Sequence, residues 1–222
     1  MAKTSLNNTA YQILLDRIVS CHYLPGHWLN EERLVSELGI SRTPIHAALI
    51  RLQQEGLVQI MPKKGIHVAP ITAKSVRDLF NLRDLIEPHA IYNYADNFEK
   101  DKLMEFLATF SNWDNQITAE QTFAADAQFH ITIVGLARND ILSNYYQTLQ
   151  NQLTRIAYIG SRTTAERLQH SNKEHADILL ALLQDDREQA RNRLLLHLKE
   201  ARQSAYQTVL SRESEGQEHP AK

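Results

Sequence analysis

The chain has 222 residues, of which 43% are hydrophobic and 23% are charged, a composition typical of a globular protein. No apolar run approaches the ~20 residues of a membrane-spanning helix, the N-terminus lacks a secretion signal, and the single cysteine cannot form an internal disulfide. These features exclude a membrane protein and a disulfide-stabilised secreted protein, and they predict a cytoplasmic location.

Charge is unevenly distributed along the chain. The net charge of −2 argues against a strongly basic nucleic-acid-binding protein, but residues 1–70 carry +2 and the remaining residues carry −4. This contrast permits nucleic-acid binding by the N-terminal part without requiring it.

Helical spacing of apolar residues marks three segments near the N-terminus. From Tyr11 to Val19, apolar residues recur three and four positions apart, as on one face of an amphipathic helix. Two further helices are predicted over 31–38 and 42–54, and Ser41 is a suitable N-cap for the second of them.

After these helices, apolar residues recur at every second position, which is the spacing of a β-strand. Apolar residues alternate over 58–60 and again over 66–68, on either side of a basic turn at 61–65. Three short helices followed by a hairpin are the arrangement of a winged helix-turn-helix domain, which we expect over residues 1–70.

Only helical periodicity follows. The predicted helices span 72–96, 100–113, 119–137, 139–160, 163–183 and 187–210. The fold class is therefore mainly α, with the N-terminal winged helix-turn-helix joined to a C-terminal all-α helical bundle over 71–210. Residues 211–222 are polar, with Gly and Pro, and predict a disordered tail.

The start of the 42–54 helix is the predicted DNA-reading element. In this domain type the second helix of the pair enters the major groove, where Arg42 can donate two hydrogen bonds to a guanine, and the wing lies against the DNA backbone. The residues predicted to contact DNA are Ser41, Arg42, Thr43, His46, Lys63, Lys64 and Gly65. The alternative is that these residues are ordinary solvated surface charges. Their placement in a helix-turn-helix followed by a wing disfavours this alternative.

These residues carry a family resemblance. The run Gly39-Ile40-Ser41-Arg42-Thr43-Pro44-Ile45, followed by Glu55-Gly56-Leu57-Val58, resembles the DNA-binding domain of GntR-family bacterial regulators. The chain departs from the family where His46-Ala47 replaces the usual Arg-Glu, and where Glu32 stands at a position that is often Arg. The resemblance thus implies DNA binding, but not at the family's usual half-site.

Four ligand-type side chains fall on inward-facing helical stripes. Asp126 and His130 are four residues apart on one helix face, and His175 and His197 lie on the apolar stripes of two later helices. One carboxylate with three imidazoles suits a divalent transition metal, with Zn²⁺ or Ni²⁺ expected first and Mn²⁺ or Fe²⁺ as alternatives. The competing interpretation is that each histidine simply packs in the core.

Arg83 occupies the centre of an apolar stripe, with Glu87 four residues later. A buried arginine is costly unless it is paired. Two roles are open: Arg83 and Glu87 form a structural ion pair, or they belong to an effector site where Arg83 holds the carboxylate of a small acid beside the metal.

The C-terminal residues also resemble a known domain. Asp126-Ala127-Gln128-Phe129-His130, then Glu174-His175 and His197, together with Leu82-Arg83-Asp84-Leu85-Ile86-Glu87, are similar to the helical effector domain (FCD type) of the FadR subgroup of GntR regulators. The resemblance implies a bundle of six or seven helices, a central metal with a small organic acid, and a homodimer.

The leading hypothesis is a ligand-responsive, dimeric DNA-binding regulator that acts as a repressor at a palindromic operator, with half-sites about one helical turn apart. A metal-dependent hydrolase or oxygenase acting on a small acid is the second hypothesis, because the same ligands can activate water. We expect no enzyme, since no general base is evident beyond the ligands and an enzyme needs no DNA-reading domain.

Overall fold

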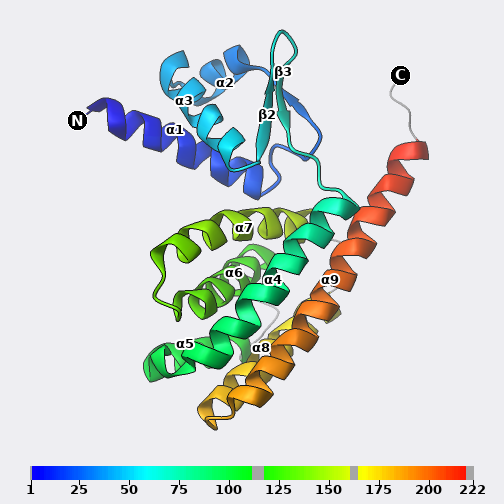
Figure 1. Cartoon of the computed structure of the whole chain (residues 1–222). Coiled ribbons are helices and arrows are strands. Elements are labelled where there is room, and N and C mark those ends of the chain that lie inside the picture. Colours follow the sequence, from blue (N-terminus) through cyan, green and yellow to red (C-terminus); the bar gives the residue numbers. More distant parts are fainter. Residues whose placement is uncertain (1, 112–117, 161–164, 219–222) are drawn as a thin grey trace. The chain divides into compact units, whose positions relative to one another are not determined.

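The computed structural model describes residues 2–111, 118–160 and 165–218 (Figure 1). The chain divides into two compact units, Met1–Ile71 and Thr72–Lys222. Within the described residues, no helix is both long enough and apolar enough to cross a membrane.

The N-terminal unit contains the three predicted helices and the predicted hairpin. Its elements are α1 (Ala2–Val19), β1 (Trp28–Leu29), α2 (Glu31–Leu38), α3 (Arg42–Gln54), β2 (Val58–Met61) and β3 (Gly65–Val68). The three strands form an antiparallel sheet in the order β1-β3-β2, in which β2 and β3 are the wing. This confirms the winged helix-turn-helix fold. Strand β1 was not predicted, because two residues are too short to show a period.

Local signals explain where the helices of this unit begin and end. The Asn30 side chain accepts hydrogen bonds from the first turn of α2, and Gly39 ends that helix with a φ of 64°, in the left-handed region that glycine favours. Ser41 occupies the N-cap position of α3, but its side chain makes no capping hydrogen bond. The capping role predicted for the Ser41 hydroxyl is therefore wrong, which leaves that hydroxyl exposed.

The C-terminal unit is all-helical, as predicted. It contains α4 (Ala73–Tyr94), the 3₁₀ turn η1 (Ala95–Asn97), α5 (Lys100–Ser111), α6 (Ala119–Gly135), α7 (Asp140–Ile159), α8 (Ala165–Leu183) and α9 (Arg187–Glu218). Thr72 caps α4 through a reciprocal pair of hydrogen bonds with Ser75. Helix α9 continues to Glu218, into the segment predicted to be a disordered tail, since Pro220 is the first proline after its start and Gly216 alone does not end it.

The core of this bundle surrounds the predicted ligand positions. The long helices α4 and α9 lie side by side, and α8 packs on α9 (Figure 1). The aromatic rings of Phe106, Phe110 and Phe129 contact one another between α5 and α6. Two of these rings, Phe110 and Phe129, also pack against the imidazole of His175, with centroids 4.5 and 5.0 Å away.

Helix α3 offers a matched test of the N-terminal core. Leu49 is 1% exposed and packs inward, whereas its neighbour Ile50 is 42% exposed. We expect Leu49→Ala to lower the free energy of unfolding by about 2–5 kcal/mol through lost burial and the cavity it leaves. Ile50→Ala should cost less than about 1 kcal/mol. Chemical denaturation of both variants measures the difference, and equal costs would contradict the core assigned here.

Candidate metal centre and DNA-reading surface

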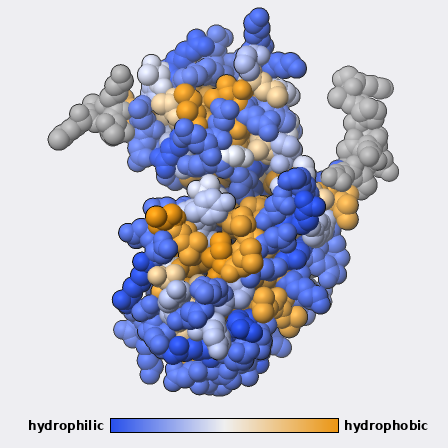
Figure 2. Space-filling view, in the orientation of Figure 1, coloured by the Kyte–Doolittle hydropathy of each residue, from blue (hydrophilic) through white to orange (hydrophobic). Residues whose placement is uncertain are grey.

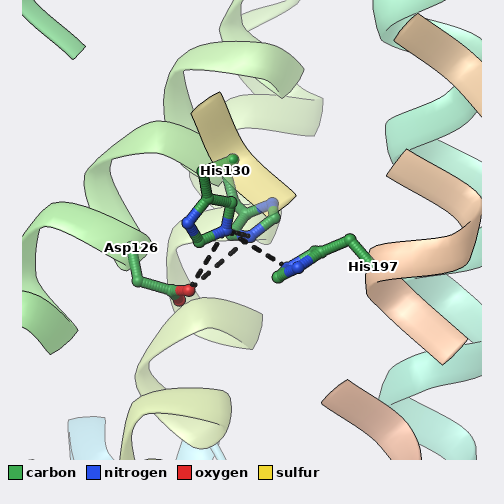
Figure 3. Close-up of side chains that lie close together, drawn as sticks. Asp126, His130 and His197 are labelled. Atoms are coloured by element: carbon green, nitrogen blue, oxygen red, sulfur yellow. Dashed lines mark hydrogen bonds and ion pairs between the residues drawn. The ribbon is translucent and has the colours of Figure 1, made fainter. Parts of the chain in front are cut away.

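The four predicted metal ligands converge on one point. Asp126 and His130 project from α6, His175 from α8 and His197 from α9, and one candidate ligand atom from each lies within 4.8 Å of all the others. Figure 3 shows the Asp126, His130 and His197 side chains directed toward a common centre. The three histidines are fully or almost fully buried, while Asp126 is partly exposed.

The spacing of these atoms suits a bound cation. The Nε2 atom of His175 lies 3.3 Å from Nε2 of His130, 3.2 Å from Nε2 of His197 and 3.4 Å from Oδ1 of Asp126. Zn–N bonds of about 2.0–2.1 Å in tetrahedral geometry place neighbouring ligand atoms about 3.3–3.4 Å apart. The side chains are thus separated as ligands of one ion would be.

Hydrogen bonds to carboxylates determine how two of the imidazoles face the centre. Nδ1 of His130 lies 2.7 Å from Oε2 of Glu87, and Nδ1 of His197 lies 2.8 Å from Oε2 of Glu174. In a neutral imidazole that donates from Nδ1, the Nε2 atom carries a lone pair, so both lone pairs point toward His175. Convergent lone pairs of this kind are what a divalent cation binds.

Burial keeps His175 and His197 in the neutral form that can bind a metal. It lowers the pKa values of His175 and His197 well below the ordinary value, and nearby positive groups lower them further. Both imidazoles are therefore neutral at neutral pH. The donor set of three imidazole nitrogens and one carboxylate fits Zn²⁺, Ni²⁺, Mn²⁺ or Fe²⁺.

The Glu87 carboxylate connects several side chains that lie behind the candidate metal ligands. This fully buried carboxylate accepts hydrogen bonds from Nε of Arg83 and from the Tyr146 hydroxyl, both at 2.5 Å, and it faces His130. Burial alone would raise the pKa of Glu87, but the charge of Arg83 and the hydrogen bonds from Arg83 and His130 outweigh it and hold that pKa below its usual value. The Arg83–Glu87 ion pair considered from the sequence is present.

The sequence interpretation did not predict Tyr146, and it named Glu174 in the family motif without predicting its supporting role. Tyr146 comes from α7 and Glu174 from α8, and each meets its partner only through the packing of separate helices. Glu174 is in turn held by the Arg167 guanidinium, at 3.2 Å. Its position beside His175 in the sequence was the one available signal for Glu174.

A cavity of about 130 Å³ adjoins the centre. Asp126 and His197 line it, as do Arg83 and Arg167, together with apolar side chains such as Phe80 and Leu153. Glu87 is not among the lining residues, so its carboxylate faces Arg83, Tyr146 and His130 rather than the cavity.

The predicted DNA-reading residues lie at the exposed start of α3 and at the tip of the wing. Arg42 and His46 have side-chain exposures of 70% and 54%, and both lie within ion-pair distance of Glu31, at 3.6 and 3.4 Å. Ser41 and Thr43 are exposed beside them, and Lys63 and Lys64 are exposed in the wing turn. The sequence interpretation did not anticipate that Glu31 lies between two base-reading candidates.

Gly65 is required by the fold of the wing. Its φ is 108°, and a Cβ atom at this position would lie 3.0 Å from the Leu29 carbonyl oxygen. A side chain would therefore strain the backbone and crowd β1, whatever the contact of Gly65 with DNA.

Comparison with known protein families gives the identity of both units. Residues 6–68 match the model of bacterial regulatory proteins of the gntR family, and residues 78–200 match the FCD domain. The chain belongs to the GntR family. It is a DNA-binding transcriptional regulator with an FCD effector domain, and its relatives are named as regulators rather than enzymes.

Two curated relatives cover most of the chain. The Nta operon transcriptional regulator of Aminobacter aminovorans is 30% identical over 171 residues, which are 76% of this chain and 80% of that protein. The HTH-type transcriptional repressor RspR of Escherichia coli is 26% identical over 205 residues, which are 91% of this chain and 90% of that protein.

Solved structures share the fold. The E. coli protein McbR/YncC has a TM-score of 0.79 at 21% identity and covers 91% of this GntR-family chain and 97% of its own. The Zn²⁺-bound FCD domain of TM0439 has a TM-score of 0.52 at 20% identity, over 64% of this chain and 96% of that one. An FCD domain that binds zinc is thus among the structural neighbours.

Glu87 gives a test of the carboxylate support. In Glu87→Gln the amide cannot accept from Arg83, Tyr146 and His130 together, so His130 loses its fixed orientation. We expect Zn²⁺ affinity to fall about 10- to 100-fold, measured by competition with a chromogenic chelator. The matched control is Glu105→Gln on α5, where the side chain is 66% exposed. Unchanged affinity in a folded Glu87→Gln protein would contradict this role.

Proposed function

We propose that this GntR regulator is a homodimeric repressor that reads a palindromic operator and releases or binds it in response to a small carboxylate held at a metal centre. The observation that carries the proposal is the convergence of Asp126, His130, His175 and His197 beside a cavity that also exposes Arg83. A regulator of this kind acts on the chromosome and therefore in the cytoplasm, as the composition predicts.

The metal would be Zn²⁺ or Ni²⁺, with Mn²⁺ and Fe²⁺ also compatible with the ligands. Bound there, the ion supplies a Lewis-acidic anchor for a carboxylate oxygen. Arg83 presents a guanidinium from the cavity wall for the same carboxylate, and Glu87 fixes the orientation of both Arg83 and His130. In this proposal Glu87 serves the effector site through these two residues, without touching the ligand. The zinc in the FCD domain of TM0439 supports this choice.

Helix α4 connects sensing with DNA binding along the chain. It carries Arg83. It begins at Ala73, after a short connection from the wing strand β3, which ends at Val68. An effector can switch DNA binding only if it binds two arrangements of the protein with different affinity. We propose that carboxylate binding at Arg83 selects among positions of α4 and so among spacings of the two recognition helices.

Exposed apolar residues support a dimer formed through the helical unit. Leu85 of α4 is 72% exposed, and Ile141 and Tyr145 of α7 are 83% and 56% exposed. Figure 2 shows apolar residues gathered on the visible face of this unit. Apolar surface of this kind marks interaction sites. The name of the relative RspR supports a repressor role.

Operator binding tests the DNA-reading residues. We expect full-length protein to select a palindrome from a random duplex library. Arg42→Ala should weaken binding by about 1–3 kcal/mol and relax the preference at one base pair, because Arg42 would read that base. The Lys63→Ala, Lys64→Ala double variant should weaken binding to all sequences and reduce its salt dependence. Lys102→Ala on α5 is the charge control. Failure to select any palindrome would overturn the proposed function.

Metal analysis tests the sensing centre. Purified protein should contain a divalent transition metal, and chelation should lower its melting temperature because the ion binds the folded state. His175→Ala should abolish the bound metal, whereas His170→Ala, an exposed histidine on the same helix, should not. Metal-free protein whose melting is unaffected by chelators and added Zn²⁺ would contradict the centre.

A further inference from the structure

Two buried amides share the cavity with the candidate metal centre. Gln150 of α7 and Asn172 of α8 both line it, and each residue is only 3% exposed. Within the described part of the chain, neither side-chain amide makes a hydrogen bond, and the Gln150 oxygen is buried without a partner. Buried amides in proteins are normally satisfied. A buried, unsatisfied Gln150 oxygen beside the unbonded Asn172 amide in one cavity therefore indicates a ligand with matching polar groups.

Two hydroxyl groups of the cavity wall are already hydrogen-bonded within the protein. The Thr122 hydroxyl donates to the Thr118 carbonyl oxygen, and the Thr154 hydroxyl donates to the backbone carbonyl oxygen of Gln150. Thr122 and Thr154 thus need nothing from a ligand. The side-chain amides of Gln150 and Asn172 each offer both a donor and an acceptor.

The charges around the cavity limit the charge of the ligand. Arg83 is paired with Glu87, and Arg167 is paired with Glu174. A divalent ion with Asp126 as its one carboxylate ligand then leaves a single positive charge. One carboxylate would balance it. A second carboxylate would face uncharged amides with no counter-charge, which is costly in a buried site.

We propose that the effector is a polyhydroxy monocarboxylate, with its carboxylate at the metal and Arg83 and its hydroxyl groups on the amides of Gln150 and Asn172. A hydroxyl donates and accepts, so it satisfies an amide in either orientation. The apolar side chains Phe80 and Leu153 would contact the carbon chain. This inference rests on the proposed function and defines the chemical class of its ligand.

Four-carbon acids separate the possible ligand classes. Erythronate and threonate carry one carboxylate and three hydroxyls, tartrate replaces the terminal hydroxymethyl group with a second carboxylate, and butyrate has no hydroxyl. With Zn²⁺-loaded full-length protein, we expect calorimetry to show at least one of the two sugar acids binding about tenfold or more tightly than tartrate or butyrate. Melting temperatures should rise in the same order.

Substitutions at the amides test the contacts directly. Gln150→Leu and Asn172→Leu should each weaken binding of the preferred sugar acid about ten- to hundredfold, and should leave butyrate binding within about threefold of wild type. Thr122→Val is the matched control, since it removes a buried cavity hydroxyl that is already bonded to Thr118, and it should change sugar-acid binding by less than about threefold. Metal content and the melting temperature without ligand establish that each variant folds. If Gln150→Leu does not fold, Gln150→Met replaces it in the same measurement.

The outcomes separate this inference from the proposed function. Tighter binding of tartrate or butyrate, equal binding of all four acids, or leucine variants that bind the sugar acid like wild type would overturn the ligand class while metal and operator binding stand. Absence of metal or operator binding in the same preparation would overturn the proposed function, and this inference with it.

Discussion

The buried carboxylate of Glu87 is the constraint on which the C-terminal unit depends. It joins Arg83 on its own helix, His130 on α6 and Tyr146 on α7, so three helices meet at one fully buried charge. A buried ion pair is expensive to form and more expensive to break, at about 3–5 kcal/mol for the loss of one partner. The relative positions of these helices are therefore coupled to the orientation of His130, a candidate metal ligand, and of the cavity arginine Arg83.

Pairing of charged side chains also extends to the other side of the candidate metal centre. Each cationic side chain of the cavity has its own carboxylate, with Arg167 on Glu174 as Arg83 is on Glu87. Glu174 also fixes His197, while His175 is held by the rings of Phe110 and Phe129. The centre is thus preorganised by hydrogen bonds on two sides and by aromatic packing on the third. With these side chains fixed, the chemistry of any bound molecule would depend on the other groups that line the cavity.

Much of this architecture could be predicted from the sequence, because it depends on periodicity. Spacing placed Asp126 and His130 on one helix face, and the change of period at residue 58 located the wing. The partners of Tyr146 and Glu174 could not be predicted, since contacts between helices depend on packing that spacing does not encode. Strand β1 was missed because pairing with β3, and not its own two residues, makes it a strand. The DNA contacts of the α3 and wing residues stay predictions.

Glu31 links two exposed side chains at the start of α3, those of Arg42 and His46. Its carboxylate lies between Arg42 and His46, and one of its oxygens is buried. The two proposed base-reading positions therefore share one anionic neighbour. A change at position 46 alters the surroundings of Arg42 through residue 31. If Arg42 and His46 read bases, a transplant of the α3 sequence into a related regulator would also need Glu31, in the preceding helix, to keep the same surroundings for these side chains.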